Sequence, residues 1–164
     1  MGELRALFES LGHSDVSTFI RSGNVIFTSR ARPDPATFER AFGDRFGFSV
    51  PVVLRTHEEL EKVLGRNPFD GVDLSKLHVG FMAARPPDAA VAGIDAASFH
   101  PEELAIRGNE VYLHLPNGMG RAKLPAYADR QLKTPLTIRN WGTVTKLCEM
   151  SRAASRTSSG SVSR

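Results

Sequence analysis

The 164-residue chain carries a net charge of +3, and its 41% of hydrophobic residues is typical of a globular protein with a core. No apolar run approaches the roughly 20 residues that cross a bilayer, and the first residues lack the apolar region of a signal peptide. The single cysteine, Cys148, excludes an internal disulfide and is typical of a reducing compartment. We therefore expect a cytoplasmic protein with no membrane partner.

The charge is unevenly distributed along the chain. Residues 1–104 carry 11 Lys and Arg against 15 Asp and Glu, a net of −4. Residues 105–164 carry 10 Lys and Arg against 3 Asp and Glu, a net of +7. The basic end indicates a surface that faces anions, although a solubilising face with a basic tail would give the same composition.

Hydrophobic spacing and turn residues predict the elements of the first half. Leu4, Leu7, Phe8 and Leu11 follow helical spacing, and Gly12 ends that helix. The expected elements, in order, are a helix over 4–11, strands over 16–20 and 25–28, a helix over 35–46, a strand over 50–54 and a helix over 57–64.

The second half repeats this order with one strand more at its start. The expected elements are a strand over 77–82, a short helix over 87–92, a hairpin of 103–106 and 110–115, a helix over 121–132, a strand over 136–139 and a helix over 141–153. This β-α-β-β-α-β order is that of a ferredoxin-like, split-βαβ unit. We therefore predict an α+β fold of two ferredoxin-like halves, residues 1–72 and 73–153, followed by a disordered, serine-rich tail over 154–164.

The first half lacks the opening strand of such a unit. That strand runs through the middle of a split-βαβ sheet, so its absence leaves unpaired strand edges inside the core. We infer that the chain is truncated, or that Met1 is an internal methionine of a longer protein. Such a chain is expected to be poorly soluble or to borrow a strand by oligomerising, and its oligomeric state is otherwise open.

The richest motif is the stretch 114–124, HLPNGMGRAKL, between the predicted hairpin and helix. Backbone N–H groups at a helix start attract anions, whereas cations there oppose the helix dipole unless an anion compensates them. The motif therefore predicts an anion site, although a connection with solvated cations would need no ligand. The candidate ligand-binding residues are His114, Asn117, Gly118, Gly120, Arg121 and Lys123.

A second candidate stretch follows the last predicted strand. Arg139 ends that strand, and Asn140 is a natural N-cap for the final helix. Trp141, with Arg139 and Lys146 nearby in sequence, has the chemistry to stack on a base or another flat ligand. Packing of a lone tryptophan in the core explains the same residue without a ligand.

A third stretch is the turn between the first two strands. Arg21 and Asn24 are candidates for hydrogen bonding a ligand, although turn preferences alone explain these residues. The five histidines show no metal-ligand spacing, and no nucleophile elbow is present. We predict no metal site and no cofactor, and we expect Cys148 to be buried and inert.

Four stretches together resemble one known family: 20–27 (IRSGNVIF), 67–69 (NPF), 112–124 (YLHLPNGMGRAKL) and 137–147 (TIRNWGTVTKL). They are similar to the bacterial domain-of-unknown-function family 1697, over residues 1 to about 153. The resemblance implies a duplicated ferredoxin-like fold, with another strand ahead of the position of Met1. It implies no established activity. Arg21 and Gly142 depart from the residues usual in that family, so no side-chain role is carried over to them.

Three functions remain open. The leading hypothesis is the binding of a phosphate-bearing ligand, a nucleotide or nucleic acid, at the basic, glycine-flanked helix start. The second is an enzyme acting on a small anionic metabolite in the cleft between the halves, with His114 as acid or base and Arg121, Lys123 and Arg139 as an electrostatic clamp. The third is a protein–protein interaction module.

Overall fold

The computed structural model describes residues 2–19 and 23–159, with side chains up to Ala154. It divides into two compact units, Met1–Leu60 with Lys146–Arg164 and Glu61–Thr145. The sequence-based division at 72 and 73 differs from this grouping, because the last helix from Lys146 onward has its contacts in the first unit. The mixture of helices and sheets confirms the α+β class.

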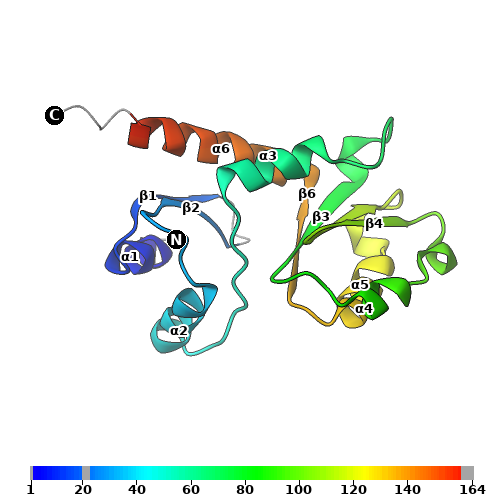
Figure 1. Cartoon of the computed structure of the whole chain (residues 1–164), viewed down its shortest axis with the longest axis horizontal. Helices are drawn as coiled ribbons and strands as arrows, with labels where there is room; N and C mark the ends of the chain where they lie inside the picture. The colour runs from blue at the N-terminus through cyan, green and yellow to red at the C-terminus, as the bar shows by residue number, and fades with distance from the viewer. Residues whose placement is uncertain (1, 20–22, 160–164) are drawn as a thin grey trace. The chain divides into compact units, whose positions relative to one another are not determined.

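The first unit is built on a small sheet with α1 (Gly2–Ser10) and α2 (Pro35–Phe46) on one face (Figure 1). Its elements are α1 (Gly2–Ser10), β1 (Ser14–Phe19), β2 (Asn24–Thr28), α2 (Pro35–Phe46) and the start of α3 (His57–Gly65). β1 and β2 pair antiparallel, with Ser17 opposite Ile26. Phe8 of α1 stacks on Phe38 of α2 with ring centroids 4.8 Å apart, and Phe27 of β2 joins them.

Local signals set the ends of α2 as the sequence predicts. The Asp34 side chain accepts a hydrogen bond from the Ala36 amide, and Pro35 fills the first helical position, where its missing N–H costs nothing. The helix ends at Gly47, which takes the left-handed φ of 76° that glycine adopts without strain.

The strand predicted over residues 50–54 was wrong. Pro51 has no N–H to donate, and the Val52 amide donates instead to the Glu39 carboxylate at 2.9 Å. Val52 and Leu54 still pack against the cluster around Phe38. The apolar pattern therefore marked a buried segment correctly, but a strand also needs a partner strand for its backbone.

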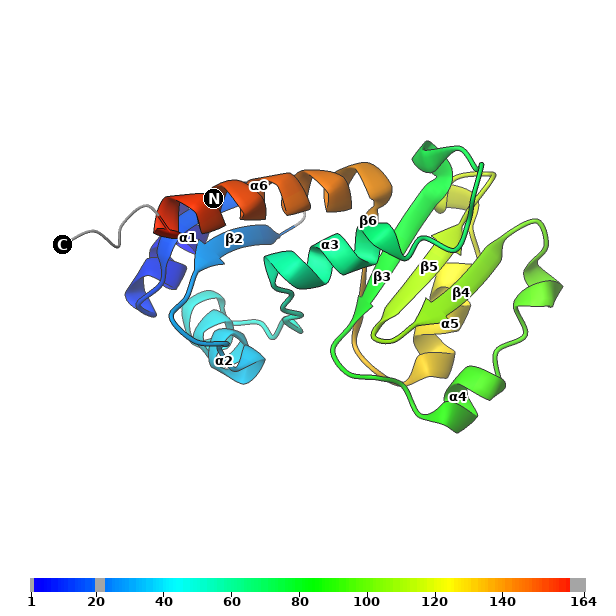
Figure 2. The same ribbon diagram turned by 45° about the horizontal axis from the view of Figure 1, so that its top comes forward.

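The second unit contains a four-stranded antiparallel sheet in the order β4-β5-β3-β6 (Figure 2). Its strands are β3 (Leu77–Met82), β4 (Glu103–Arg107), β5 (Glu110–His114) and β6 (Leu136–Asn140). Its helices are α4 (Asp88–Ala92) and α5 (Leu124–Leu132). Three 3-10 turns connect these elements: η1 (Leu74–Lys76), η2 (Ala96–Phe99) and η3 (Met119–Arg121). All six residues of the central strand β3 are buried. The four strands predicted for this half are confirmed.

One face of this sheet carries the larger core. Leu113 and Met82 of the sheet pack with Leu124 and Leu132 of α5, all fully buried. On the other face Tyr112 reaches Val63 in the second half of α3, donating its hydroxyl hydrogen to the Val63 carbonyl. Strand alternation therefore decides which side chains of β3, β5 and β6 point toward α5.

Two helix boundaries differ from the prediction. The helix expected from residue 121 begins at Leu124, after the 3-10 turn η3. The last helix, α6 (Trp141–Ser159), continues past the expected end at Ala153, so residues 154–159 are helical and not part of a disordered tail. No glycine or proline interrupts the sequence between Gly142 and Gly160. Residues 160–164 lie outside the described part of the chain.

Within the described ranges, no helix combines the length and hydrophobicity that a membrane span requires.

Candidate functional site

The sheet brings the two basic stretches of the second unit to one end of β3. His114, the last residue of β5, lies opposite Leu77, and Asn140, the last residue of β6, lies opposite His78. The loop after β5 and the start of α6 therefore leave the sheet at the same end of its strands. Glu103, the first residue of β4, lies at this end as well, because it lies opposite His114.

The start of α5 already holds an anion. Glu102 accepts hydrogen bonds from the Lys123 amide, at 3.1 and 3.2 Å to its two carboxylate oxygens, and from the Leu124 amide at 2.8 Å. A carboxylate in this position satisfies amides that have no partner inside the helix and offsets the helix dipole. The sequence analysis predicted that amides at this helix start contact a ligand. In the structure these amides donate to the carboxylate of Glu102 from the same chain.

The cationic side chains beside this helix start are open to solvent. Arg121 and Lys123 are both exposed, and neither forms an ion pair with any residue that the structure describes. Gly118 precedes them with a φ of 84° and a ψ of 159°, a conformation that only glycine adopts readily. Asn117 and Gly120 are also exposed, so the whole loop offers polar groups to a ligand.

Arg139 lies on the opposite face of the sheet from this loop. Ile138 packs with the α5 core, so alternation turns Arg139 to the other side. Its guanidinium donates to the Thr137 hydroxyl at 2.7 Å and to the Ile138 carbonyl at 3.0 Å. Burial lowers the pKa of Arg139. The structure therefore does not gather Arg139 with Arg121 and Lys123 into the predicted clamp.

The start of α6 is organised as the sequence predicts. The Asn140 side chain accepts a 2.8 Å hydrogen bond from the Thr143 amide, which confirms the N-cap. Trp141 is partly exposed, and its carbonyl accepts from the Thr145 hydroxyl at 2.9 Å. Lys146 belongs to the first unit and pairs with Glu149 at 3.6 Å.

His114 is held by an acidic residue of the neighbouring strand. Its Nδ1 lies 2.9 Å from Oε1 of Glu103, and the ring of Phe69 lies against it with centroids 5.9 Å apart. The His114 side chain is 15% exposed. It shares the Tyr112 face of β5, two residues away, and so points away from α5. The pair can orient the imidazole, which is one requirement of acid–base chemistry.

Of the two candidate turn residues in the first unit, the structure describes Asn24 but not Arg21. Asn24 is buried, and its side-chain amide donates to the Phe19 carbonyl at 3.2 Å across the β1–β2 hairpin. This bond is a structural role of the kind that turn preferences alone explain. Arg21 lies outside the described residues.

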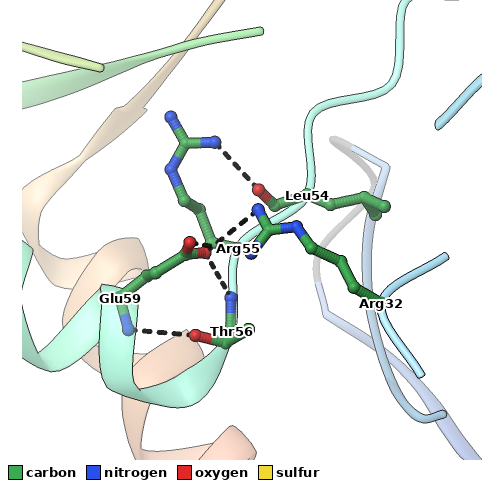
Figure 3. Close-up of polar contacts among 5 residues, drawn as sticks. All are labelled: Arg32, Leu54, Arg55, Thr56 and Glu59. Carbon is green, nitrogen blue, oxygen red and sulfur yellow. Dashed lines mark hydrogen bonds and ion pairs between the residues drawn. The ribbon is translucent and has the colours of Figure 1, made fainter. Parts of the chain in front are cut away.

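Sequence reasoning missed a polar cluster at the start of α3 (Figure 3). Thr56 and Glu59 form a capping box, and Arg32 adds an ion pair to Glu59 at 2.8 Å. Partial burial acts to raise the pKa of Glu59, but hydrogen bonds from Arg32 and the Thr56 amide, with the charges of Arg32 and Arg55, outweigh it and lower that pKa. Arg32 precedes Glu59 by 27 residues, so no local spacing could have linked them.

A buried histidine was also missed as a site of interest. His78, on the central strand, is 9% exposed, and its Nδ1 has no hydrogen-bond partner among the residues that the structure describes. Burial lowers the pKa of His78, against the effect of a hydrogen bond with the Lys76 backbone. Among the described residues, no group of three or more His, Cys, Asp or Glu is arranged to hold a metal ion.

A family model described as "Protein of unknown function (DUF1697)" matches residues 1–112 of the 164. The match includes the stretches 20–27 and 67–69, and the other two stretches of the resemblance lie at or beyond its last residue. No curated protein and no solved structure matches the chain.

Proposed function

The chain belongs to this family of proteins of unknown function, DUF1697, and we propose that it binds a phosphate-bearing ligand at the loop of residues 117–123. The ligand class is a nucleotide or a nucleic-acid segment. The observation that carries the proposal is the capture of the Glu102 carboxylate by the Lys123 and Leu124 amides.

The Glu102 contact supports an anion site because these amides already donate to a carboxylate of the chain itself. Two backbone amides and the positive end of α5 attract a carboxylate from a residue 21 and 22 positions away. Arg121 and Lys123 add two exposed cations that no described residue neutralises. The single negative charge of Glu102 does not neutralise both the two cations and the positive end of the helix dipole. The remaining positive charge favours the binding of an external phosphate.

Nucleotide and nucleic acid share the phosphate chemistry and differ in how salt affects binding. A protein that neutralises several phosphates releases their counterions, so its affinity for nucleic acid falls steeply with added salt. Trp141, at the same end of the sheet, supplies a partly exposed aromatic ring for stacking a base.

Calorimetric titration with inorganic phosphate, ATP and a short single-stranded RNA tests the proposal. We expect binding at low salt, and we expect the double variant Arg121→Ala, Lys123→Ala to weaken it by about tenfold or more, which corresponds to about 1.4 kcal/mol. Arg130→Ala is the matched control, since it removes an exposed cation from the last turn of the same helix. Absence of binding for all three probes at low salt removes the proposal.

Glu102 offers a second arm of the same experiment. Glu102→Ala frees both amides and removes a competing negative charge, so phosphate is expected to bind several times more tightly. Glu102→Gln keeps a hydrogen-bond acceptor, and its gain should be smaller because only the charge is lost. Unchanged affinity in both variants would show that the helix start takes no part in binding.

The Glu103–His114 pair favours a second candidate function, an enzyme acting on a small anionic metabolite. A carboxylate 2.9 Å from Nδ1 can orient an imidazole so that Nε2 transfers a proton. A thermal-shift screen of phosphorylated and carboxylated metabolites tests this candidate. Stabilisation that survives both His114→Ala and Arg121→Ala would exclude these residues as its site.

We also propose that both units are ferredoxin-like halves of a duplicated fold and that the first lacks its central strand. In the second unit the central strand β3 lies between β5 and β6. In a ferredoxin-like half the corresponding position would lie between β2 and residues 50–54, and the lack of a strand over 50–54 among the described residues supports a missing neighbour. A bacterial source and a cytoplasmic location remain proposals that rest on the sequence resemblance and on the lone Cys148.

A further inference from the structure

His78 is a buried polar side chain near the start of the central strand β3. It is 9% exposed, and its Nδ1 forms no hydrogen bond with any residue that the structure describes. The Lys76 carbonyl affects the pKa of the ring, but its 2.8 Å hydrogen bond comes from the Leu115 amide. Because buried polar groups in native proteins nearly always have a partner, an imidazole nitrogen without one is a candidate ligand contact.

The sheet places His78 between the two basic stretches of the second unit. Its strand β3 lies between β5, which leads into the loop of residues 117–123, and β6, which leads into α6 (Figure 2). His78 lies directly opposite Asn140, the last residue of β6. On the other side, the bond from the Leu115 amide to the Lys76 carbonyl fixes the beginning of the loop beside the same end of β3.

The His78 side chain lies on the face of the sheet that α5 covers. Met82, four residues along β3, packs in the α5 core, and side chains alternate between the faces of a strand. Asn140 is on this face too, since Ile138 packs in the same core. Leu115, which precedes the loop, is a further residue of that core. The imidazole, the loop and the N-cap of α6 therefore share one face at one end of the sheet.

The start of α6 offers donors and carries no negative charge. This helix has 19 residues, and its first turn contains no acidic residue. The Asn140 side chain accepts from the Thr143 amide, whereas the amides before it have no partner inside the helix. Gly142, which is exposed, has no side chain that could cover them. His78 and this helix start thus present hydrogen-bonding groups from two neighbouring strands.

The spacing of the strands sets the length of a ligand that reaches all these groups. Neighbouring strands lie about 4.8 Å apart, so the ends of β5 and β6 are about 10 Å apart, with His78 between them. A single phosphate group is too small to contact both the loop and the start of α6. A nucleoside phosphate has the length, and its base adds an uncharged edge of N–H groups and lone pairs.

The chemistry of His78 suits such an uncharged edge better than a phosphate. Burial lowers the pKa of His78, so the ring is largely neutral at neutral pH. A neutral imidazole offers one N–H donor and one acceptor, and no positive charge. Arg121 and Lys123 on the loop supply that charge instead, because both are exposed cations.

We infer that His78 contacts the ligand directly and that the ligand is a nucleoside phosphate, with its base edge hydrogen-bonded to His78 and its phosphate at Arg121 and Lys123. The inference rests on the phosphate site proposed above and narrows its ligand from any phosphate-bearing molecule to one that carries a base. A free nucleotide and a unit of a single strand of RNA share this chemistry.

Calorimetric titration of His78→Phe with ATP, ribose 5-phosphate and inorganic phosphate tests the contact. Phenylalanine fills the site without hydrogen bonding, so we expect the affinity for ATP to fall by about tenfold. Affinities for ribose 5-phosphate and inorganic phosphate should stay unchanged, since neither carries a base. His100→Phe is the matched control, because it alters an exposed histidine of the same unit and should leave all three affinities as they are.

The outcomes separate this inference from the phosphate site itself. If the native protein binds phosphate and His78→Phe binds ATP and RNA as tightly as the native protein does, the base contact is refuted and the phosphate site stands. If no probe binds, both fall. A short single-stranded RNA in place of ATP shows which form of the ligand is bound, because a loss of affinity in His78→Phe for either probe supports the contact.

Nitrogen-15 NMR of the histidine rings tests the contact in the native protein, where misfolding of a variant has no influence. The ring resonances of His78 are assigned through bonds from its backbone. We expect its Nδ1 resonance to shift when ATP or the short RNA is added and to stay in place when inorganic phosphate is added. A His78 ring spectrum that is identical with and without saturating ATP and RNA overturns the inference.

Discussion

The hydroxyl of Tyr112 donates a 2.6 Å hydrogen bond to the carbonyl oxygen of Val63. The bond ties β5 to α3 across 49 residues of sequence, and the Tyr112 side chain is fully buried. Burial raises the pKa of Tyr112 to about 12, with the Glu110 charge acting in the same direction. This contact therefore contributes to packing and to the dependence of stability on pH.

Tyr112→Phe removes the hydrogen bond while keeping the ring. We expect the free energy of unfolding at neutral pH to fall by about 1 kcal/mol, the usual net worth of a buried hydrogen bond. Urea unfolding of both proteins measures the difference. An equally stable variant would mean that the Val63 carbonyl loses nothing when the hydroxyl is absent.

The same variant tests how the ionisation of Tyr112 affects stability at alkaline pH. The folded state keeps the phenol protonated up to about pH 12, whereas the unfolded chain ionises near 10. The unfolded state thus binds fewer protons between these values, and the stability of the native protein falls as pH rises through this window. Tyr112→Phe lacks this loss, so the gap between the two proteins should narrow above pH 10.

Gly80 is the position in β3 where an added methyl group meets the core. A Cβ there would lie 2.7 Å from Cδ1 of Leu136 and 3.5 Å from Cβ of Val111. We expect Gly80→Ala to cost about 1–3 kcal/mol of stability, because packed cores tolerate an extra carbon poorly. The cost should shrink in a Leu136→Ala background, and thermal unfolding of all four proteins in the double-mutant cycle measures that coupling. If the two destabilisations are strictly additive, contact with Leu136 does not cause the cost of Gly80→Ala.

Glu102 should also contribute to stability without any ligand. Its carboxylate caps the Lys123 and Leu124 amides, so Glu102→Ala is expected to destabilise the chain by about 0.5–2 kcal/mol, the range found for lost helix caps. Glu102→Gln should cost less, because the amide oxygen still accepts a hydrogen bond. Chemical unfolding at low and high salt separates the hydrogen bonds from the charge, since salt screens only the charge.

His78 predicts a loss of stability on the acid side. Its ordinary pKa of 6.5 is lowered by burial in the folded state, so the unfolded chain binds a proton first as pH falls. The native protein should therefore lose stability below about pH 6.5, and the contribution is complete above that value. His78→Leu cannot titrate, and its stability should exceed that of the native protein increasingly as pH is lowered. Parallel slopes against pH would contradict the assignment to His78.

The sequence predicted elements well where the signals were local. The bounds of α2 follow from Asp34, Pro35 and Gly47, each of which acts within two or three residues of the helix end. The strand β3 was predicted with its observed ends, because its apolar run lies between the polar pair Ser75-Lys76 and the turn-forming stretch Arg85-Pro86-Pro87. Such signals need no knowledge of the rest of the fold.

The sequence failed where the outcome depended on partners far along the chain. Residues 50–54 have a strand-like pattern but no described partner, and Glu102 reaches α5 across more than 20 residues. Two errors were avoidable from local evidence. Pro125 is favoured in the first turn of a helix and marks the true start of α5. Alternation through Leu136 and Ile138 assigns Arg139 to the face away from α5.

The position of Glu102 has a consequence for how binding would be detected. Glu102 directly precedes β4, an outer strand of the four-stranded sheet. A phosphate that displaced its carboxylate would exchange one negative charge for another at α5, while releasing the tether at the beginning of that outer strand. Faster amide exchange at residues 103 and 104 on adding ligand would then report occupancy from a segment that the ligand never touches.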